Sequence, residues 1–339
     1  MVDNFVAHLF SHIEVKKHNT LIDEIDYPGI ASTVKGCVEC PGLNVYNGKA
    51  INSGFKSHNY EVKQFEAVGN LGSFGLGFFN DITVPIYKGR FEIIFIRNND
   101  NNVIYLRKSL KTDGTEDAST LPNEGKIVIK TFCLRVPIIE YNSDAEIMLI
   151  KELLDNSYFF QLKNWQCIQH MKVIGKTLHL DITNIYRNVT NPLWAFVVFQ
   201  TSRSGNQQKD NSEFDHTDVK NLWMEVGGTR YPEEFWDLDF DENLYALAYE
   251  AFQDFKTTFF KTDSIPYVDK KGFKAMYPIY SIDLTGQPQN VSNVKSNMLH
   301  VDFNKALPDP SGSNEGNICY IVRVSNCLLR YEPDKNKIT

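Results

Sequence analysis

An unbroken apolar run, Leu193–Phe199, is the feature that most constrains the fold of this chain. A polar loop, Ser202–Asp218, separates this run from a second apolar segment, Leu222–Val226. Short apolar runs that are rich in β-branched and aromatic residues, and that are bounded by turn residues, are typical of strands buried on both faces. The sequence therefore predicts two buried strands joined by a long loop.

Two segments of the chain have residue patterns that predict helices. Apolar residues of Leu244–Phe255 recur at i, i+3, i+4, i+7, i+8 and i+11, which places them on one face of a helix. Asp241 has the side chain expected of its N-cap. A shorter helix is predicted to begin at Ser143, because Ser143 and Glu146 match a capping box. This shorter helix would link the two halves of the chain.

The remaining sequence alternates strand-like segments with polar loops. Aromatic residues make up 13% of the chain, with 23 Phe and 16 Tyr, and this content favours a packed, β-rich protein over a disordered one. The pattern predicts all-β architecture, as β-sandwiches with Greek-key connections, and 339 residues are enough for two of them. The further predicted strands are Phe5–Val15, Phe91–Arg97, Ile127–Val136, Tyr158–Ile168, Ala275–Thr285 and Ile318–Leu329.

Charge and hydropathy exclude several classes of protein. The net charge of −7 argues against extensive neutralisation of phosphates, so direct sequence-specific binding of nucleic acid is not expected. No apolar run approaches the ~18 residues of a membrane span. The N-terminus has no basic region followed by an apolar block, so we expect no signal peptide and no secretion. Six cysteines without a zinc-finger spacing favour reduced thiols and an intracellular location, in cytoplasm or nucleus.

Candidate chemistry is sparse in this sequence. Asp215 and His216 form the most suggestive cluster, because a carboxylate and an imidazole can bind a metal together. The alternative, which we favour, is that both residues anchor a loop through backbone contacts. On a strand, His8 and His12 would share a face but lie ~13 Å apart, too far to share a metal. The sequence predicts no enzyme and no cofactor.

One set of motifs resembles a known family. The motif residues are Asn191, Pro192, Trp194, Gln200, Arg203, Phe214, Tyr231 and Pro232. In their order and spacing they resemble the double jelly-roll capsid-like proteins that are encoded by Polinton/Maverick elements and related animal DNA viruses. The resemblance extends over nearly the whole chain, from the segment at Phe5 to the closing strand at Cys319–Val322.

The resemblance carries specific expectations. It implies two tandem jelly rolls, residues 1–142 and residues 143–339, of which the first lacks strands that the family has before Phe5–Val15. It also implies a major capsid protein whose homotrimers are pseudo-hexameric capsomers of an icosahedral shell. The implied partners are neighbouring capsomers and a minor single jelly-roll capsid protein, and the implied location is the virion. The alternative that we consider is a host-domesticated jelly-roll module that binds protein or glycan without forming a shell.

Overall fold

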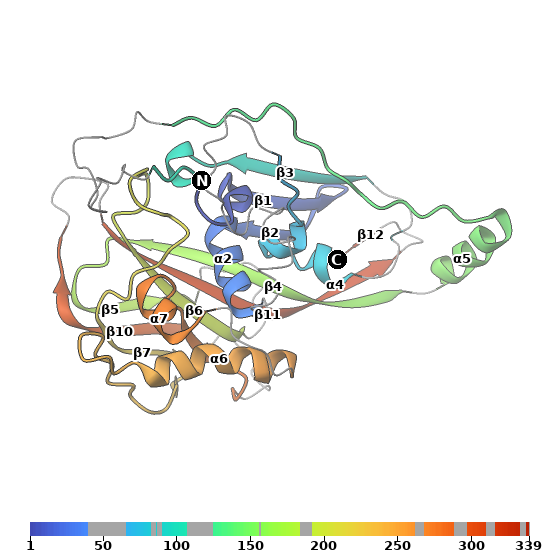
Figure 1. Cartoon of the computed structure of the whole chain (residues 1–339). Coiled ribbons are helices and arrows are strands. Elements are labelled where there is room, and N and C mark those ends of the chain that lie inside the picture. The colour runs from blue at the N-terminus through green and yellow to red at the C-terminus, as the bar shows by residue number, and fades with distance from the viewer. Residues whose placement is uncertain are drawn as a thin grey trace.

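The computed structural model describes residues 1–39, 66–82, 86, 90–106, 125–155, 157–183, 192–261, 268–287, 297–309, 316–332 and 337–338. These residues form three antiparallel sheets with few helices (Figure 1). The mostly-β architecture predicted from the sequence is therefore confirmed. Among the helices in the described ranges, none is long and apolar enough to span a membrane.

Two of the three sheets belong to the second half of the chain. One has the order β5-β10-β7-β8, and the other has the order β12-β11-β6-β9, with β4 on the other side of β11. The strands are β4 (Tyr158–Met171), β5 (Gly175–Asp181), β6 (Pro192–Thr201), β7 (Val219–Val226), β8 (Thr229–Tyr231), β9 (Tyr280–Asp283), β10 (Asn297–Leu307), β11 (Asn317–Glu332) and β12 (Lys337–Ile338).

Strand β6 lies at the centre of this half and is buried on both faces, as its apolar sequence predicts. On one face, the ring of Phe199 lies 5.6 Å from that of Phe303 in β10. On the other, the ring of Phe196 lies 5.0 Å from that of Phe255 in helix α6 (Ala246–Phe260). Alternate residues of a strand point to opposite faces, so an uninterrupted apolar run suits a strand that is covered by a sheet on one side and a helix on the other.

The longest strands are β4 and β11. They pair without a register shift from Tyr158 opposite Tyr331 to Met171 opposite Ile318. Strand β4 begins at Tyr158, as predicted, and continues three residues beyond Ile168, whereas β11 is longer than the predicted strand Ile318–Leu329 at both ends. Figure 1 shows the two strands crossing the whole width of the molecule beneath the first half.

Helix α6 confirms the predicted helix but begins later than expected. Its N-cap is Tyr245 and not Asp241, because Leu244 exchanges two backbone hydrogen bonds with Asp239 before the helix begins. Phe252 and Phe255 are buried, whereas Leu247 is 48% exposed. The predicted strand Ala275–Thr285 is also shorter, since helix α7 (Lys270–Ala275) precedes β9.

The first half contains the third sheet, of order β2-β1-β3. The predicted strand Phe5–Val15 is wrong at its start, because Phe5–His8 is helix α1 and the strand begins at Phe10. Strand β2 was missed, because its acidic residues break the apolar pattern. The elements are β1 (Phe10–Lys17), β2 (Thr20–Asp26), α2 (Pro28–Glu39), η2 (Leu71–Phe74), α4 (Phe78–Asp81), β3 (Phe91–Arg97) and η3 (Asp100–Asn102).

The two halves share one packed core. Buried side chains of α2, such as Val34, belong to the same apolar cluster as Trp165 of β4 and Phe255 of α6. Helix α4 also links the halves, because the Asp81 carboxylate accepts a hydrogen bond of 2.6 Å from the Lys163 amide of β4. The division into residues 1–142 and 143–339 remains a prediction.

The predicted strand Ile127–Val136 is wrong. Residues 127–142 pair with no other strand among the described residues, and they lead into helix α5 (Ser143–Asp155). Helix α5 confirms the helix predicted to begin at Ser143, although Asn142 caps it, since its Oδ1 accepts a hydrogen bond of 2.9 Å from the Ala145 amide. Its role as a link between two jelly rolls remains a prediction. Figure 1 shows α5 at the tip of an extension that projects from the body. We call residues 127–155 the arm.

Gly77 provides a test of the packing between α4 and β4. A Cβ atom at Gly77 would overlap the carbonyl oxygen of Lys163, and this oxygen belongs to a strand held in the ladder with β11. We expect Gly77→Ala to lower the free energy of unfolding, measured with urea, by about 1–3 kcal/mol through overpacking. The control is Gly286→Ala, where the nearest atom to the new Cβ would be 3.9 Å away. Equal effects of the two variants would contradict this account.

Candidate functional site

The loop after β6 is anchored by an ion pair between Arg203 and Asp215. The Asp215 carboxylate accepts from Arg203 Nη2 at 2.7 Å, from Arg203 Nε at 3.0 Å and from the Thr201 amide at 2.7 Å. Arg203 also donates to the carbonyl oxygen of Asp210 at 2.7 Å. Bidentate arginine–carboxylate pairs are among the strongest charge-assisted contacts. These contacts hold the end of the loop, at Asp215, next to the end of β6, at Thr201.

His216 has contacts with residues other than this ion pair. Its ring stacks on Phe240 with ring centroids 4.4 Å apart, and its Nδ1 accepts from the Asp218 amide at 3.1 Å. Burial lowers the pKa of His216. Asp215 and His216 therefore have separate partners, as the loop-anchor interpretation expects, and a metal shared by them remains an untested candidate that would have to displace Arg203.

The other motif residues are mostly packing residues. Trp194 and Phe214 are almost fully buried, and Gln200 holds the loop by donating to the carbonyl oxygens of Asn211 and Glu213. The carbonyl oxygen of Pro192 accepts from Gln287. Tyr231 and Pro232 are joined by a cis peptide bond next to β8, and Asn191 lies outside the described residues.

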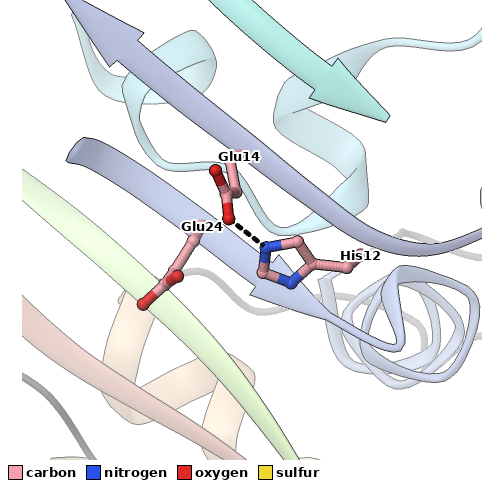
Figure 2. Close-up of side chains that lie close together, drawn as sticks. All are labelled: His12, Glu14 and Glu24. Carbon is pink, nitrogen blue, oxygen red and sulfur yellow. Dashed lines mark hydrogen bonds and ion pairs between the residues drawn. The ribbon is translucent and has the colours of Figure 1, made fainter. Parts of the chain in front are cut away.

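A second cluster lies on the β1–β2 hairpin and was not predicted. His12 and Glu14 of β1 and Glu24 of β2 each offer one ligand atom, and these atoms all lie within 4.8 Å of one another. Figure 2 shows the three side chains on neighbouring strands, with His12 Nε2 lying 3.1 Å from Glu14 Oε1. They lie on the face opposite to the buried Ile13 and Val15. Within the described ranges, this is the one group of three or more such residues close enough to hold a metal ion.

Charged neighbours complete this cluster. Asp26 Oδ1 lies 2.6 Å from His12 Nδ1, so each imidazole nitrogen faces a carboxylate. Lys16 forms an ion pair with Glu14, and this hydrogen-bonded ammonium, together with His12, lowers the pKa of the Glu14 carboxyl. The cluster is half-buried and open to solvent, so a small ion can reach it.

A third group lies on the exposed face of the β5-β10-β7-β8 sheet. His179 Nδ1 lies 2.7 Å from His300 Nδ1 across the strands. The His300 ring also stacks on Trp223, with centroids 5.0 Å apart, and Arg230 lies over both Trp223 and Phe235. The Phe235 side chain is 53% exposed. Exposed aromatic rings beside an arginine are typical of binding surfaces.

Comparison with known proteins identifies the family. A family model described as "Double jelly roll-like domain" matches residues 1–323. The chain belongs to this family. The double jelly roll-like domain thus covers both halves, as the motifs around β6 predicted. No curated protein gives a significant match to the chain.

Solved structures similar to this double jelly roll-like chain come from viruses. They include a quasi-atomic model of the PBCV-1 virus capsid, at 7% identity and a TM-score of 0.46, over 100% of this chain and 85% of that chain. A cryo-EM structure of the Sputnik virophage is 12% identical, with a TM-score of 0.41, over 100% of this chain and 75% of that chain. The major capsid protein P2 of bacteriophage PM2 is 9% identical, with a TM-score of 0.29, over 94% of this chain and 82% of that chain.

Proposed function

We propose that this protein is a structural building block of the capsid type, which assembles with further copies of itself. Membership of the double jelly roll-like family supports this proposal. The observation that carries this proposal is the arm, because its exposed apolar side chains would be stabilised by burial against another protein and not by contact with water. The described residues contain no group for which we propose a catalytic role.

The arm exposes many large apolar side chains. Ile138 is 83% exposed and Met148 is 72% exposed. Burying one such side chain stabilises an interface by about 1.5–3 kcal/mol. Contiguous exposed apolar surface marks interaction sites. The large apolar residues exposed on the arm are Val128, Ile129, Phe132, Leu134, Val136, Ile138, Ile139, Tyr141, Ile147 and Met148.

A second copy of this chain is the occupant that we propose for the arm. Residues 126–136 carry Lys126, Lys130 and Arg135 and no acidic residue. The open face of the β2-β1-β3 sheet carries Glu14 and Glu24 in directly opposed positions. The basic first part of the arm, up to residue 136, and the two carboxylates of the sheet face are complementary between copies, and such complementarity steers association and fixes register.

Assembly is tested by the mass of the purified full chain in solution. We expect light scattering to give three times 38.9 kDa or larger assemblies, with rings or shells in negative-stain images. The variant Ile138→Glu/Met148→Glu places two charges on the arm and should reduce the mass to that of one chain. The control Leu247→Glu changes an exposed apolar residue of α6 outside the arm and should leave assembly intact. A monomeric wild-type chain would contradict the proposal.

The finer form of the proposal follows the resemblance. The assembled unit would be a homotrimeric, pseudo-hexameric capsomer of an icosahedral shell, in contact with neighbouring capsomers and with a minor single jelly-roll capsid protein. The protein would then be found in virions of a Polinton/Maverick-type element or a related animal virus. Trimers that tile into shells support this form, and trimers that never associate further contradict it.

The second candidate is a domesticated module that binds protein or glycan. The cluster of Trp223, Arg230 and Phe235 favours it, because exposed rings can stack on a sugar or an aliphatic side chain. A folded monomer that binds a defined glycan on an array, and that loses binding in Trp223→Ala, would favour this candidate over the capsid proposal.

A further inference from the structure

We propose that His12, Glu14 and Glu24 form a zinc-binding site on the solvent-facing side of the β1–β2 hairpin. This inference goes beyond the assembly role, and zinc bound to Glu14 and Glu24 would compete for these two carboxylates with the basic part of the arm of another copy. It rests on the strand register, on the orientation of the imidazole and on the charge of the cluster.

The register of the hairpin brings the ligands together. Glu14 lies directly opposite Glu24, and His12 lies directly opposite Asp26. Directly opposed residues of antiparallel strands have Cβ atoms about 4.5–5.5 Å apart, and residues two apart in one strand share a face. The ligand atoms of His12, Glu14 and Glu24 therefore converge without any change of backbone.

Asp26 orients the imidazole for metal binding. Its carboxylate lies 2.6 Å from His12 Nδ1. In the neutral tautomer that is protonated on Nδ1, this nitrogen donates to Asp26 and the lone pair of Nε2 is directed toward Glu14. A histidine that binds a metal commonly donates its other N–H to a carboxylate in this way. His12 Nε2 and Glu14 Oε1 are 3.1 Å apart, which is close to the roughly 3.3 Å expected for two ligand atoms about 2 Å from a tetrahedral zinc ion.

The donor set and charge favour zinc over calcium or magnesium. Calcium and magnesium prefer oxygen ligands alone, whereas one imidazole with two carboxylates suits zinc, and three protein ligands leave a position for water. Glu14 and Glu24 are directly opposed, and like charges in that position destabilise a strand pair. A divalent cation would balance both charges.

Lys16 competes with the metal in this arrangement. Its ammonium group pairs with Glu14 in the structure, and it lies directly opposite Glu92 of β3. When zinc binds Glu14, Lys16 can turn to Glu92 without moving the backbone. We therefore expect zinc affinity to rise when Lys16 is replaced by an uncharged residue of similar length.

A protonated His12 is the competing explanation for the same contacts. An imidazolium would donate to Asp26 from one nitrogen and to Glu14 from the other, with no metal involved. The two explanations differ in one respect, which is whether the chain binds zinc at these residues with measurable affinity at a pH where histidine is neutral.

The test is calorimetric titration of the chelator-treated full chain with Zn²⁺ alone, in a His179→Ala background. This background removes the close His179–His300 pair, which could bind zinc by itself. We expect one site, and we expect His12→Ala and Glu24→Gln each to weaken it at least tenfold. Asp26→Asn should weaken it about 10–100-fold through loss of imidazole orientation, and Lys16→Met should strengthen it. Zinc should raise the melting temperature of the parent and not that of Glu24→Gln.

Each alternative outcome is decisive. A parent chain that binds no zinc would leave the protonated His12 as the explanation and would overturn the proposal. Equal zinc binding by the parent, His12→Ala and Glu24→Gln would place the ion elsewhere and would also overturn it. Circular dichroism without metal shows whether each variant is folded, and the isosteric Glu24→Gln keeps the test valid if His12→Ala fails to fold.

Discussion

Phe255→Ala is expected to lower the free energy of unfolding by about 3–5 kcal/mol, the range for removal of a large buried aromatic side chain. Phe255 is fully buried, and its ring packs against those of Trp194 and Phe196 in β6 at 5.1 and 5.0 Å and against Phe259 at 4.9 Å. These ring contacts join α6 to β6. The truncation removes these contacts and leaves a cavity that the rigid strands cannot fill.

Urea unfolding of the full chain measures this loss. The control is Leu247→Ala, on the same helix but 48% exposed, which should change the free energy of unfolding by no more than about 0.5 kcal/mol. If the two variants were equally stable, α6 would not be packed on β6 in the manner described.

Replacing Asp23 with Asn is expected to change how stability depends on pH. Asp23 is a buried residue of β2 whose Oδ2 accepts from the Phe78 amide at 2.9 Å. Burial is the main cause that raises the pKa of its carboxyl to about 7, and the nearby Asp81 and Glu24 carboxylates raise this pKa further. Hydrogen bonds from the backbone amides of Phe78 and Glu24 lower the pKa and so oppose the increase. The folded chain therefore favours the protonated carboxyl, while the unfolded chain ionises near the usual value.

The direction of the effect follows from proton linkage. Between about pH 4 and pH 7 the folded chain binds a proton at Asp23 that the unfolded chain has lost, so the contribution of this residue to stability falls as pH rises through that window. The total change is about 4 kcal/mol for a shift of this size. Asn resembles the neutral carboxyl in shape and does not ionise, so it removes this dependence.

Urea unfolding of wild type and Asp23→Asn at pH 4, 6 and 8 measures the difference directly. We expect similar stabilities at pH 4 and a variant more stable by up to about 4 kcal/mol at pH 8. Other groups titrate in both proteins and cancel in the difference. If the difference in free energy of unfolding between the two proteins were the same at pH 4, 6 and 8, Asp23 would be ionised in the folded chain throughout this range.

The elements that sequence analysis predicted correctly are those with strong local patterns and a partner within the chain. The runs around Phe196 and Phe95 are strands, and the stripe that contains Phe255 is helical. The segment Ile127–Val136 has an equally good strand pattern and is not a strand. A pattern records what a segment would bury, but a strand also needs a partner strand, and no described strand pairs with this segment.

The candidate site on the β1–β2 hairpin could not have been predicted from spacing. The acidic residues of β2 hid the strand itself, and the opposition of Glu14 and Glu24 depends on a register that includes a shift between Val15 and Lys16. Sequence analysis compared His12 with His8, which lies on a helix and not on the same strand. In contrast, the loop-anchor interpretation of Asp215 relied on neighbours in the sequence, and Arg203 and Thr201 hold its carboxylate.

The unbroken ladder between β4 and β11 has a mechanical consequence. The strands are antiparallel and stay in register from Tyr158 and Tyr331 at one end to Met171 and Ile318 at the other. A pull applied to Tyr158 and Ile318, at opposite ends of the ladder, loads all of its hydrogen bonds in shear, so they resist together. A pull applied to Tyr158 and Tyr331, at the same end, opens them one pair at a time. The molecule should therefore be stiff against forces along these strands and weak against forces that peel their ends apart.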